Sequence, residues 1–565
     1  MSTRKKNIMK QTSTNQNNLQ NLKEFFLNHK KIIQNSAAAA LLTVAVVLIG
    51  YYTLWPSRGF FHSDTTDTII WAEQSVESKS LFNPDFYYAC LLPFGTSLIM
   101  TALIPFTGVS MTTHVIGMLC FFVLFTIGLI WMLRQMGTGW GWTSVTVFTV
   151  LMICSGSEKL REIFWGHTIY YSLGVWFIFV GLALLFRRMD LAQILDRTEE
   201  EAQKRRLYGK LILCTILILV WFILTCSDQI IAITIFALPV IGAVLCERWL
   251  DKKTRVFSVR NFHALAVLLV MIIGMIGGYL LTNRLADGIT AAYEEAYSEY
   301  SDMSEWWNHI ELFPTAWLSL LGADMAKDEP LMSVKSVKAL FVVITGILLL
   351  ILPLTALLCY HQIRDEKLRI LILTYWFMTI LIMMGYIMGK LSAANWRLSP
   401  IVAMSAVVSM AFLRWAVSQI QWQRLGALLM IPLVIVSSVT AHSIAHMPKD
   451  NTSENTLYAL AEELESRGLN YGYATFWQAN GLTVVSDSKI KCRSIDIDEN
   501  DYHIRHYQCN PHWYEDQEGQ EQYFLLMTFY ERQILESINS RLLSRSHQVL
   551  NISGYEVWVF SENIF

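Results

Sequence analysis

About eleven apolar stretches, each close to the length of a membrane-crossing helix, alternate with polar loops along the chain. A helix needs roughly 20 mainly apolar residues to cross the hydrocarbon core of a bilayer. The stretches cover residues 32–55, 113–133, 140–156, 168–186, 209–225, 229–246, 263–282, 338–359, 370–388, 400–413 and 425–441. The pattern predicts a polytopic α-helical membrane protein with about 11 transmembrane helices.

The loops between these stretches differ in charge. More than half of the 44 Lys and Arg residues lie in one alternating set, formed by residues 1–31, 134–139, 187–208, 247–262, 360–369 and 414–424. The other set is poorer in Lys and Arg and consists of residues 56–112, 157–167, 226–228, 283–338 and 389–399. Because loops rich in Lys and Arg stay in the cytoplasm, we expect a multi-pass cell-membrane protein with a cytoplasmic N-terminus and an extracytoplasmic C-terminus.

Polarity divides the chain into three regions. Residues 1–31 are polar, rich in Asn and Gln, and typical of a disordered cytoplasmic segment. Residues 32–441 form the membrane domain, whose long first outer loop covers residues 56–112. In the remaining part, 442–565, a helical pattern at 453–468 and several strand-like runs predict a small extracytoplasmic α/β domain.

Composition narrows the class of protein further. The chain is 53% hydrophobic and only 16% charged, with a mean hydropathy of +0.37, which excludes an ordinary soluble protein. A net charge of −2 gives no reason to expect a nucleic-acid partner. Cys492 and Cys509 both lie in the C-terminal region and could pair, which the sequence leaves open.

Asp64 and Asp67 precede and begin an amphipathic stretch, Asp67 to Val76, in the first outer loop. One interpretation is structural: Asp64 caps the helix and Asp67 lies at its third position, where the helix dipole favours a carboxylate. The other is catalytic: a carboxylate fixed just above the membrane can act as general base toward a hydroxyl. The two are compatible, because a capping residue is held rigidly.

A second outer loop, residues 157–167, carries Glu158, Glu162 and His167. Local ion pairs at a helix start would explain the two glutamates, and hydrogen bonding at the membrane interface would explain the histidine. Alternatively, the three residues bind the acceptor of a reaction or a divalent cation. No Asp-x-Asp pattern occurs in this loop, so the metal signal is weak and we assign no metal ligand.

Arg397 and Lys390 lie in a short outer loop, residues 389–399. The planar guanidinium of Arg397 has a donor fork that suits a pair of phosphate oxygens, so we expect this loop to bind a phosphate. The alternative, for Lys390 as well, is snorkelling toward lipid headgroups.

No Gly-rich phosphate loop, Gly-x-Ser-x-Gly, His-Glu-x-x-His or CxxC pattern occurs in the chain. The apolar stretches carry almost no charges. Ion-coupled transporters place ionisable groups at mid-membrane, so their near absence argues against a transporter.

The arrangement resembles the GT-C superfamily of integral membrane glycosyltransferases. The likeness rests on one span followed by a long outer loop with an early Asp (Phe61-His62-Ser63-Asp64), a juxtamembrane helix, further spans and a C-terminal soluble domain. Short motifs also resemble uncharacterised bacterial proteins of this class: Ser63-Asp64-Thr65-Thr66-Asp67-Thr68, Asn83-Pro84-Asp85-Phe86, Leu92-Pro93-Phe94-Gly95 and Tyr471-Gly472-Tyr473-Ala474-Thr475-Phe476-Trp477.

This resemblance implies a GT-C-like fold and transfer of a sugar from a polyprenyl-phosphate donor, by inverting displacement, to an envelope glycan, lipid or protein. Asp64 would be the base and Arg397 would contact the donor phosphate. Thr65 stands where many relatives have a Glu after the Asp, so Asp67 stays open as the working carboxylate. The family's Asp-x-Asp is missing from the outer loops, so the resemblance leaves a cation requirement open.

A non-enzymatic envelope-glycan transporter or assembly scaffold is the alternative function. An enzyme predicts that Asp64, Glu158 or Glu162, and Arg397 surround one cavity at the membrane surface. A transporter predicts a polar path through the bundle.

Overall fold

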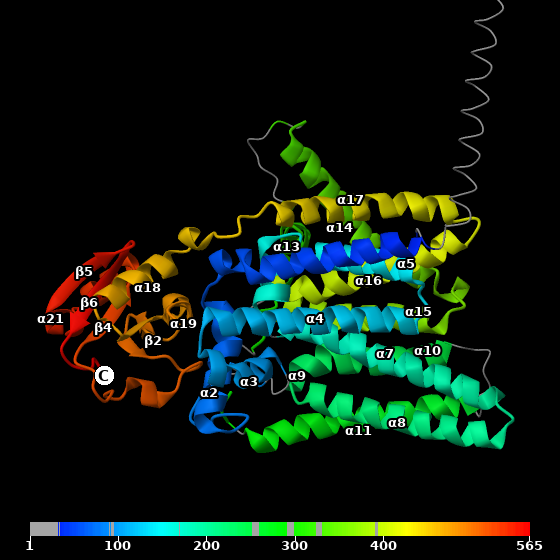
Figure 1. Cartoon of the computed structure of the whole chain (residues 1–565), viewed down its shortest axis with the longest axis horizontal. Coiled ribbons are helices and arrows are strands. Elements are labelled where there is room, and N and C mark those ends of the chain that lie inside the picture. Colours follow the sequence, from blue (N-terminus) through cyan, green and yellow to red (C-terminus); the bar gives the residue numbers. More distant parts are fainter. Residues whose placement is uncertain are drawn as a thin grey trace, which may run out of the picture.

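The computed structural model describes residues 32, 34–89, 91, 95–168, 170–250, 259–286, 288–290, 299–323, 330, 332–389 and 394–565. The predicted disordered segment, residues 1–31, and the phosphate-binding candidate Lys390 lie outside these described residues. In Figure 1 a bundle of long helices meets a small mixed domain at one end.

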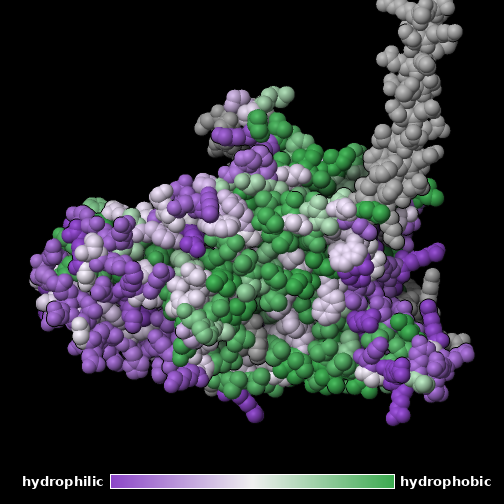
Figure 2. All heavy atoms as spheres, viewed as in Figure 1, coloured by the Kyte–Doolittle hydropathy of each residue, from purple (hydrophilic) through white to green (hydrophobic). Residues whose placement is uncertain are grey.

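Within the described residues, ten helices are long and apolar enough to cross a membrane. They are Gln34–Leu54, α4 (Met111–Gln135), α7 (Tyr170–Arg197), α8 (Glu201–Cys226), α9 to α10 (Gln229–Leu250), α11 (Val259–Leu285), α14 (Val334–Leu358), α15 (Glu366–Met388), Asn395–Ser418 ending in α16 (Ser399–Ser418), and α17 (Gln423–Ala445). Figure 2 shows an apolar belt over the bundle, with polar residues gathered on the small domain and at the opposite end. The chain is therefore a multi-pass membrane protein, as the sequence predicts.

The predicted span 140–156 is shorter than expected. It forms α5 (Trp140–Ile153), whose 14 residues extend about 21 Å at a rise of 1.5 Å per residue, less than the roughly 30 Å hydrocarbon core. The helix ends because the chain turns at Ser155 and Gly156, whose backbone N–H groups bond to Met152 and Ile153. It packs inside the bundle against α4, α16 and α17.

The first outer loop folds into two short 3-10 turns and two helices. These are η1 (Pro56–Phe60), η2 (Ser63–Thr66), α2 (Asp67–Ser78) and α3 (Thr96–Thr107). Helix α3 has 12 residues and contains Pro105, so it is too short to span a bilayer. It packs between α2 and α4 at the border of the bundle.

The C-terminal domain is built on a six-stranded sheet of order β3-β2-β1-β4-β6-β5. Its strands are β1 (Tyr471–Thr475), β2 (Lys491–Asp498), β3 (Asp501–Ile504), β4 (Tyr523–Met527), β5 (Gln548–Ile552) and β6 (Tyr555–Phe560). β1 pairs in parallel with β2 and β4, whereas β3, β5 and β6 pair antiparallel with their neighbours. The predicted α/β domain is thus confirmed.

Alternation along β1 and β4 places successive side chains on opposite faces of the sheet. Helices α18 (Thr456–Ser466) and α19 (Phe476–Val485) cover the face of Ala474 and Leu526. The other face, with Tyr473 and Leu525, carries α20 (Phe529–Ser537) and shares one hydrophobic cluster with Ile69, Trp71 and Phe86 of the first outer loop. The loop and the C-terminal domain therefore form one body around a common core.

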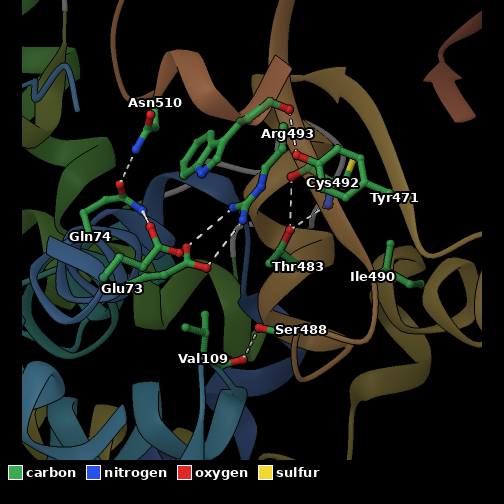
Figure 3. A network of polar contacts seen from close by, with 12 residues as sticks. Glu73, Gln74, Val109, Tyr471, Thr483, Ser488, Ile490, Cys492, Arg493 and Asn510 are labelled. Carbon is green, nitrogen blue, oxygen red and sulfur yellow. Dashed lines mark hydrogen bonds and ion pairs between the residues drawn. The ribbon is translucent and has the colours of Figure 1, made fainter. Parts of the chain in front are cut away.

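A buried ion pair fastens the two parts together (Figure 3). Arg493 of β2, only 2% exposed, lies 3.5 Å from Glu73 of α2 and is stacked over Trp513 at 4.0 Å. Next to it, Asn510 donates a 3.0 Å hydrogen bond to Gln74. Because an unpaired buried charge is costly, this contact favours one fixed docking of α2 on the sheet.

Cys492 and Cys509 are both buried free thiols, and each belongs to a different hydrophobic cluster. The pairing that the sequence leaves open is therefore not formed.

Candidate functional site

A cavity of about 530 Å³ lies where the membrane bundle, the first outer loop and the C-terminal domain meet. Four separate parts of the chain supply its walls. The lining residues are Asp64, Asp67, Ala89, Lys159, Glu162, Ile163, His167, Tyr171, Trp396, Arg397, Phe476, Trp477, Asp496, Arg505, Tyr507 and Gln508. Five of the residues singled out in the sequence thus share one cavity: Asp64, Asp67, Glu162, His167 and Arg397.

Asp64 stands on the 3-10 turn η2 rather than at a helix cap. The turn is held by threonine side chains: the backbone N–H of His62 donates to Thr65 Oγ1 at 3.3 Å, and Thr66 Oγ1 donates to the carbonyl of Ser63 at 2.6 Å. The capping interpretation of Asp64 is wrong, because α2 begins at Asp67 after Thr66 and has no side-chain cap. Asp64 is half-buried and makes no hydrogen bond or ion pair to any residue that the structure describes.

Asp67 has a different environment, although it is only one turn away. Its carboxylate is 7% exposed and lies 3.5 Å from His167 Nε2. Burial raises the pKa of Asp67 and the nearby charge of Asp64 adds to this, while the contact with His167 opposes it. The site therefore holds one accessible carboxylate and one buried carboxyl group that keeps its proton more readily.

Glu162 is the acidic residue of the second outer loop that reaches the cavity. Ser157 caps the short helix α6 (Glu158–Arg161), and the chain continues as a π-helical turn, η3 (Glu162–Gly166). Lys159 Nζ lies 2.6 Å and His62 Nε2 3.4 Å from Glu162 Oε2. Burial alone would raise the pKa of Glu162, but these two partners hold it at about 2.

Glu158, in contrast, is exposed at the start of α6 and does not line the cavity.

Arg397 enters the cavity from the opposite wall. It lies in the 3-10 turn η6 (Asn395–Leu398) directly before α16, and its Nη1 donates a long hydrogen bond of 3.4 Å to the carbonyl of Gly385. The neighbouring Trp396 ring lies 5.4 Å from Lys159 Nζ. Two cationic groups, Arg397 and Lys159, thus line the same cavity as the carboxylates.

The C-terminal domain completes the cavity with residues that the sequence reasoning missed. Arg505 is stacked between the rings of Phe476, at 4.4 Å, and Tyr507, at 4.2 Å, and its Nη1 lies 3.4 Å from Asp496 Oδ1. Asp496 belongs to an Asp-x-Asp pattern, Asp496-Ile497-Asp498, at the end of β2. That pattern was the available signal, and it escaped notice because it lies outside the loops between the spans.

No group of three or more His, Cys, Asp or Glu residues is arranged to hold a metal ion in the part of the chain that the structure describes. Asp67 and Glu162 both face basic partners, and Asp496 faces Arg505. Asp64 is the carboxylate of the cavity that faces no cation among these residues, so it is the group best placed to accept a proton.

No family model matches the sequence, and none of the curated proteins matches it. Among solved structures, the chain is similar to the Archaeoglobus fulgidus oligosaccharyltransferase in the apo form, with 11% identity and a TM-score of 0.43 over 80% of this chain and 64% of that one. It is also similar to that protein in complex with Zn and sulfate, with 12% identity and a TM-score of 0.39 over 80% and 62%. The chain thus spans less than two thirds of the length of these proteins. At such low scores the likeness carries no argument about activity, which has to rest on the site.

Proposed function

We propose that this protein is a glycosyltransferase that moves a sugar from a polyprenyl-phosphate donor to an acceptor at the outer membrane surface. The observation that carries the proposal is the convergence of Asp64, Asp67 and Arg397 in one cavity at the end of the bundle. A base for the acceptor and a cation for the donor phosphate are the two groups that such a transfer needs.

Asp64 is the proposed general base. Its carboxylate accepts the proton of the acceptor hydroxyl while the hydroxyl oxygen forms a bond to the anomeric carbon of the donor sugar. The bond between that carbon and the phosphate oxygen breaks, and its electron pair leaves with the polyprenyl phosphate. Because the nucleophile attacks opposite the leaving group, the configuration at the anomeric carbon is inverted.

Arg397 is the proposed ligand of the donor phosphate, and Lys159 supports it. Negative charge grows on the phosphate as the sugar leaves, and a guanidinium held in a low-dielectric cavity stabilises that charge more than water does. Lys159 shares its charge with Glu162 at 2.6 Å, so it contributes less to the phosphate than Arg397 does.

The position of the cavity fits a lipid-borne donor. Its walls include Trp396 and Arg397 at the start of α16 and Tyr171 at the start of α7, both ends of membrane helices. Tryptophan, tyrosine and arginine are residues that favour the bilayer interface. A donor whose polyprenyl tail stays in the bilayer would therefore present its phosphate at the level of these side chains.

The test is a transfer assay with the purified chain and a panel of polyprenyl-phosphate sugars, with and without a divalent-cation chelator. Wild type should release polyprenyl phosphate, and Asp64→Asn should lower turnover by about 10²- to 10⁴-fold, the usual contribution of a general base. Glu158→Gln, outside the cavity, is the control and should keep its turnover. If no member of the panel is consumed, or if Asp64→Asn works as well as wild type, the proposal fails.

A further inference from the structure

Trp477, Phe529 and Tyr530 are the most exposed aromatic side chains of the C-terminal domain, most of whose other aromatic residues are buried. Trp477 is 60%, Phe529 58% and Tyr530 71% exposed. Solvent-exposed aromatic rings that gather in one region often mark a binding surface.

The three rings stand on the same edge of the sheet. Trp477 is in the first turn of α19, which follows β1, and Phe529 and Tyr530 are in the first turn of α20, which follows β4. β1 and β4 are parallel neighbours, so the helices that follow them begin side by side at the carboxyl edge. A hydrogen bond of 2.6 Å from Thr475 Oγ1 to Glu531 Oε1 ties the two helix starts together.

We call Trp477, Phe529 and Tyr530 the aromatic edge; one of its members lies at the cavity. Trp477 itself lines the cavity, together with Phe476 and Tyr507. Between the last two rings lies the Arg505 guanidinium, which is paired with Asp496. The part of the cavity wall that the C-terminal domain supplies is therefore rich in aromatic rings, with charged hydrogen-bonding groups set among them.

A sugar ring matches this combination of groups. The C–H faces of a pyranose are apolar and pack flat on aromatic rings, while its hydroxyls point outward and need hydrogen-bond partners. Carboxylate and guanidinium groups beside the rings provide such partners. A lipid tail would use only the rings, and would leave Asp496 and Arg505 without a role.

We infer that the aromatic edge binds the acceptor and that the acceptor is a glycan chain, whose end enters the cavity and presents a hydroxyl to Asp64. The inference rests on the proposed glycosyl transfer and names the acceptor class for the same site. Trp477 would hold the sugar unit next to the cavity, and Phe529 and Tyr530 the units farther out.

The experiment uses the full chain in detergent with linear oligosaccharides of hexose and N-acetylhexosamine units. Trp477→Ala and Tyr530→Ala should each weaken binding of the best oligosaccharide by about 5- to 10-fold, measured by calorimetry without donor. In the transfer assay the same variants should raise KM for this acceptor and leave KM for the donor unchanged. Trp249→Ala is the matched control, because Trp249 is 84% exposed at the end of α10 and does not line the cavity.

The outcomes separate this inference from the proposed function. If wild type consumes donor but Trp477→Ala and Tyr530→Ala keep the KM of wild type for the acceptor, glycosyl transfer stands and the aromatic edge has no part in it. If wild type transfers sugar only to a peptide or a lipid, or binds none of the oligosaccharides, the glycan assignment is overturned. If no donor is consumed while the oligosaccharides bind at Trp477, the surface is retained and the enzyme proposal is lost.

Discussion

Asp64 and Asp67 are three positions apart, and their surroundings divide the possible roles between them. Asp64 faces the cavity without a cationic partner among the described residues, whereas Asp67 is buried against His167. Burial favours the neutral form of a carboxyl group and raises the pKa of Asp67. We therefore propose Asp64 as the base, with Asp67 placed to orient His167.

Asp67→Asn should change how stability depends on pH. Burial raises the pKa of Asp67, so its contribution to stability is full at acid pH, where the group is neutral, and is lost as the pH rises through the raised pKa. The amide introduced by the substitution would resemble the neutral carboxyl at every pH. We expect wild type and variant to unfold at similar temperatures in acid, and wild type to fall below the variant toward neutral pH, as followed by thermal unfolding in detergent.

Glu162→Gln should change the pH dependence of stability in the opposite direction to Asp67→Asn. The pKa of Glu162 lies at about 2, below its ordinary 4.5, so the ionised form is favoured by folding. Its stabilisation is present above 4.5 and is lost as the pH falls toward 2. The variant should therefore be less stable than wild type at neutral pH, and the difference in unfolding temperature should shrink in acid. If both variants follow wild type with the same difference at every pH, the environments described for Asp67 and Glu162 are contradicted.

Arg397→Lys and Arg397→Ala should weaken donor binding in that order. The guanidinium fork gives two aligned donors to a phosphate, whereas Lys provides one point charge. The affinity for a polyprenyl-phosphate sugar, measured on purified protein, is the readout. If Lys binds donor as well as Arg does, Arg397 is an interfacial anchor, because Lys snorkels to headgroups equally well.

At the scale of elements, a glycine lies where the C-terminal domain packs against the turn that carries Asp64. Helix α19 packs against η2, which carries Asp64. A Cβ at Gly481 would lie 2.9 Å from Leu457 Cδ1 and 3.4 Å from Ser63 Oγ. A side chain larger than a methyl group at this position would therefore press on Leu457 of the domain and on Ser63 of the turn.

Gly481→Val should push α19 away from η2 and displace Asp64. A displacement of about 1 Å at a catalytic group can lower the rate about 10²-fold, so we expect turnover to fall while donor affinity, set at Arg397, changes little. Gly141→Val is the control, since a Cβ there has no neighbour within 4 Å. Equal turnover in both variants would show that η2 is held by other contacts.

Arg493→Ala should loosen the first outer loop from the C-terminal domain. It leaves Glu73 buried without its partner, a change that typically costs about 3–5 kcal/mol. The domain should then unfold at lower temperature and be cut more readily by protease near the linker at 446–455. Arg493→Met combined with Glu73→Gln removes both charges and should recover much of the loss; a double variant as unstable as the single one would contradict a charge-based cause.

The elements that sequence reasoning found are those whose pattern is local. α18 was predictable because Leu457, Leu460, Ala461 and Leu464 recur on one helix face, and all four are buried. α19 was missed because it is apolar on nearly every side, packed between the sheet and η2, and so shows no helical periodicity. The strand-like stretch 548–560 forms two strands, β5 and β6, because Ser553 and Gly554 make a turn with positive φ between them.

Much of the site could be predicted because its signal, too, is local in the sequence. The outer loops are polar interruptions in an apolar chain, so Asp64, Glu162 and Arg397 stood out there. Arg505 and Tyr507 did not stand out, because charged and aromatic residues are common in a polar domain. Their place in the cavity follows from the docking of the sheet on α2, a tertiary contact without a sequence pattern.

At the scale of the whole molecule, the two ends of the bundle hold different kinds of contact. At the end opposite the cavity, Lys367 of α15 lies 2.6 Å from Asp190 of α7 and donates to the carbonyl of Gln135 at 2.6 Å. These three residues come from or adjoin segments of the Lys- and Arg-rich set. The cavity is lined from the other set and from the C-terminal domain. Among the described residues, these members of the two sets therefore lie at opposite ends of the bundle.

Helix α5 decides on which side the C-terminus lies, because ten crossings and eleven give opposite answers. It follows Gln135, at the end far from the cavity, and leads to Glu162 and His167, which line the cavity. Despite its 14 residues, α5 thus carries the chain from one end of the bundle to the other. We therefore expect an odd number of crossings, with the two termini on opposite sides of the membrane.

We therefore expect a cytoplasmic N-terminus and an extracytoplasmic C-terminus, because the end opposite the cavity carries the Lys- and Arg-rich loops. A reporter that is active only in the cytoplasm should be silent after Phe565 and active when inserted at 198–200, between α7 and α8. Activity after Phe565 with silence at 198–200 would invert the molecule and place the cavity in the cytoplasm. A reporter inserted at 137–139, between α4 and α5, tests α5 itself, because this position and Phe565 should lie on opposite sides only if α5 crosses. The same readout at 137–139 and after Phe565 would mean that α5 does not cross, and would separate the Glu162 loop from the side of Asp64, contrary to the shared cavity.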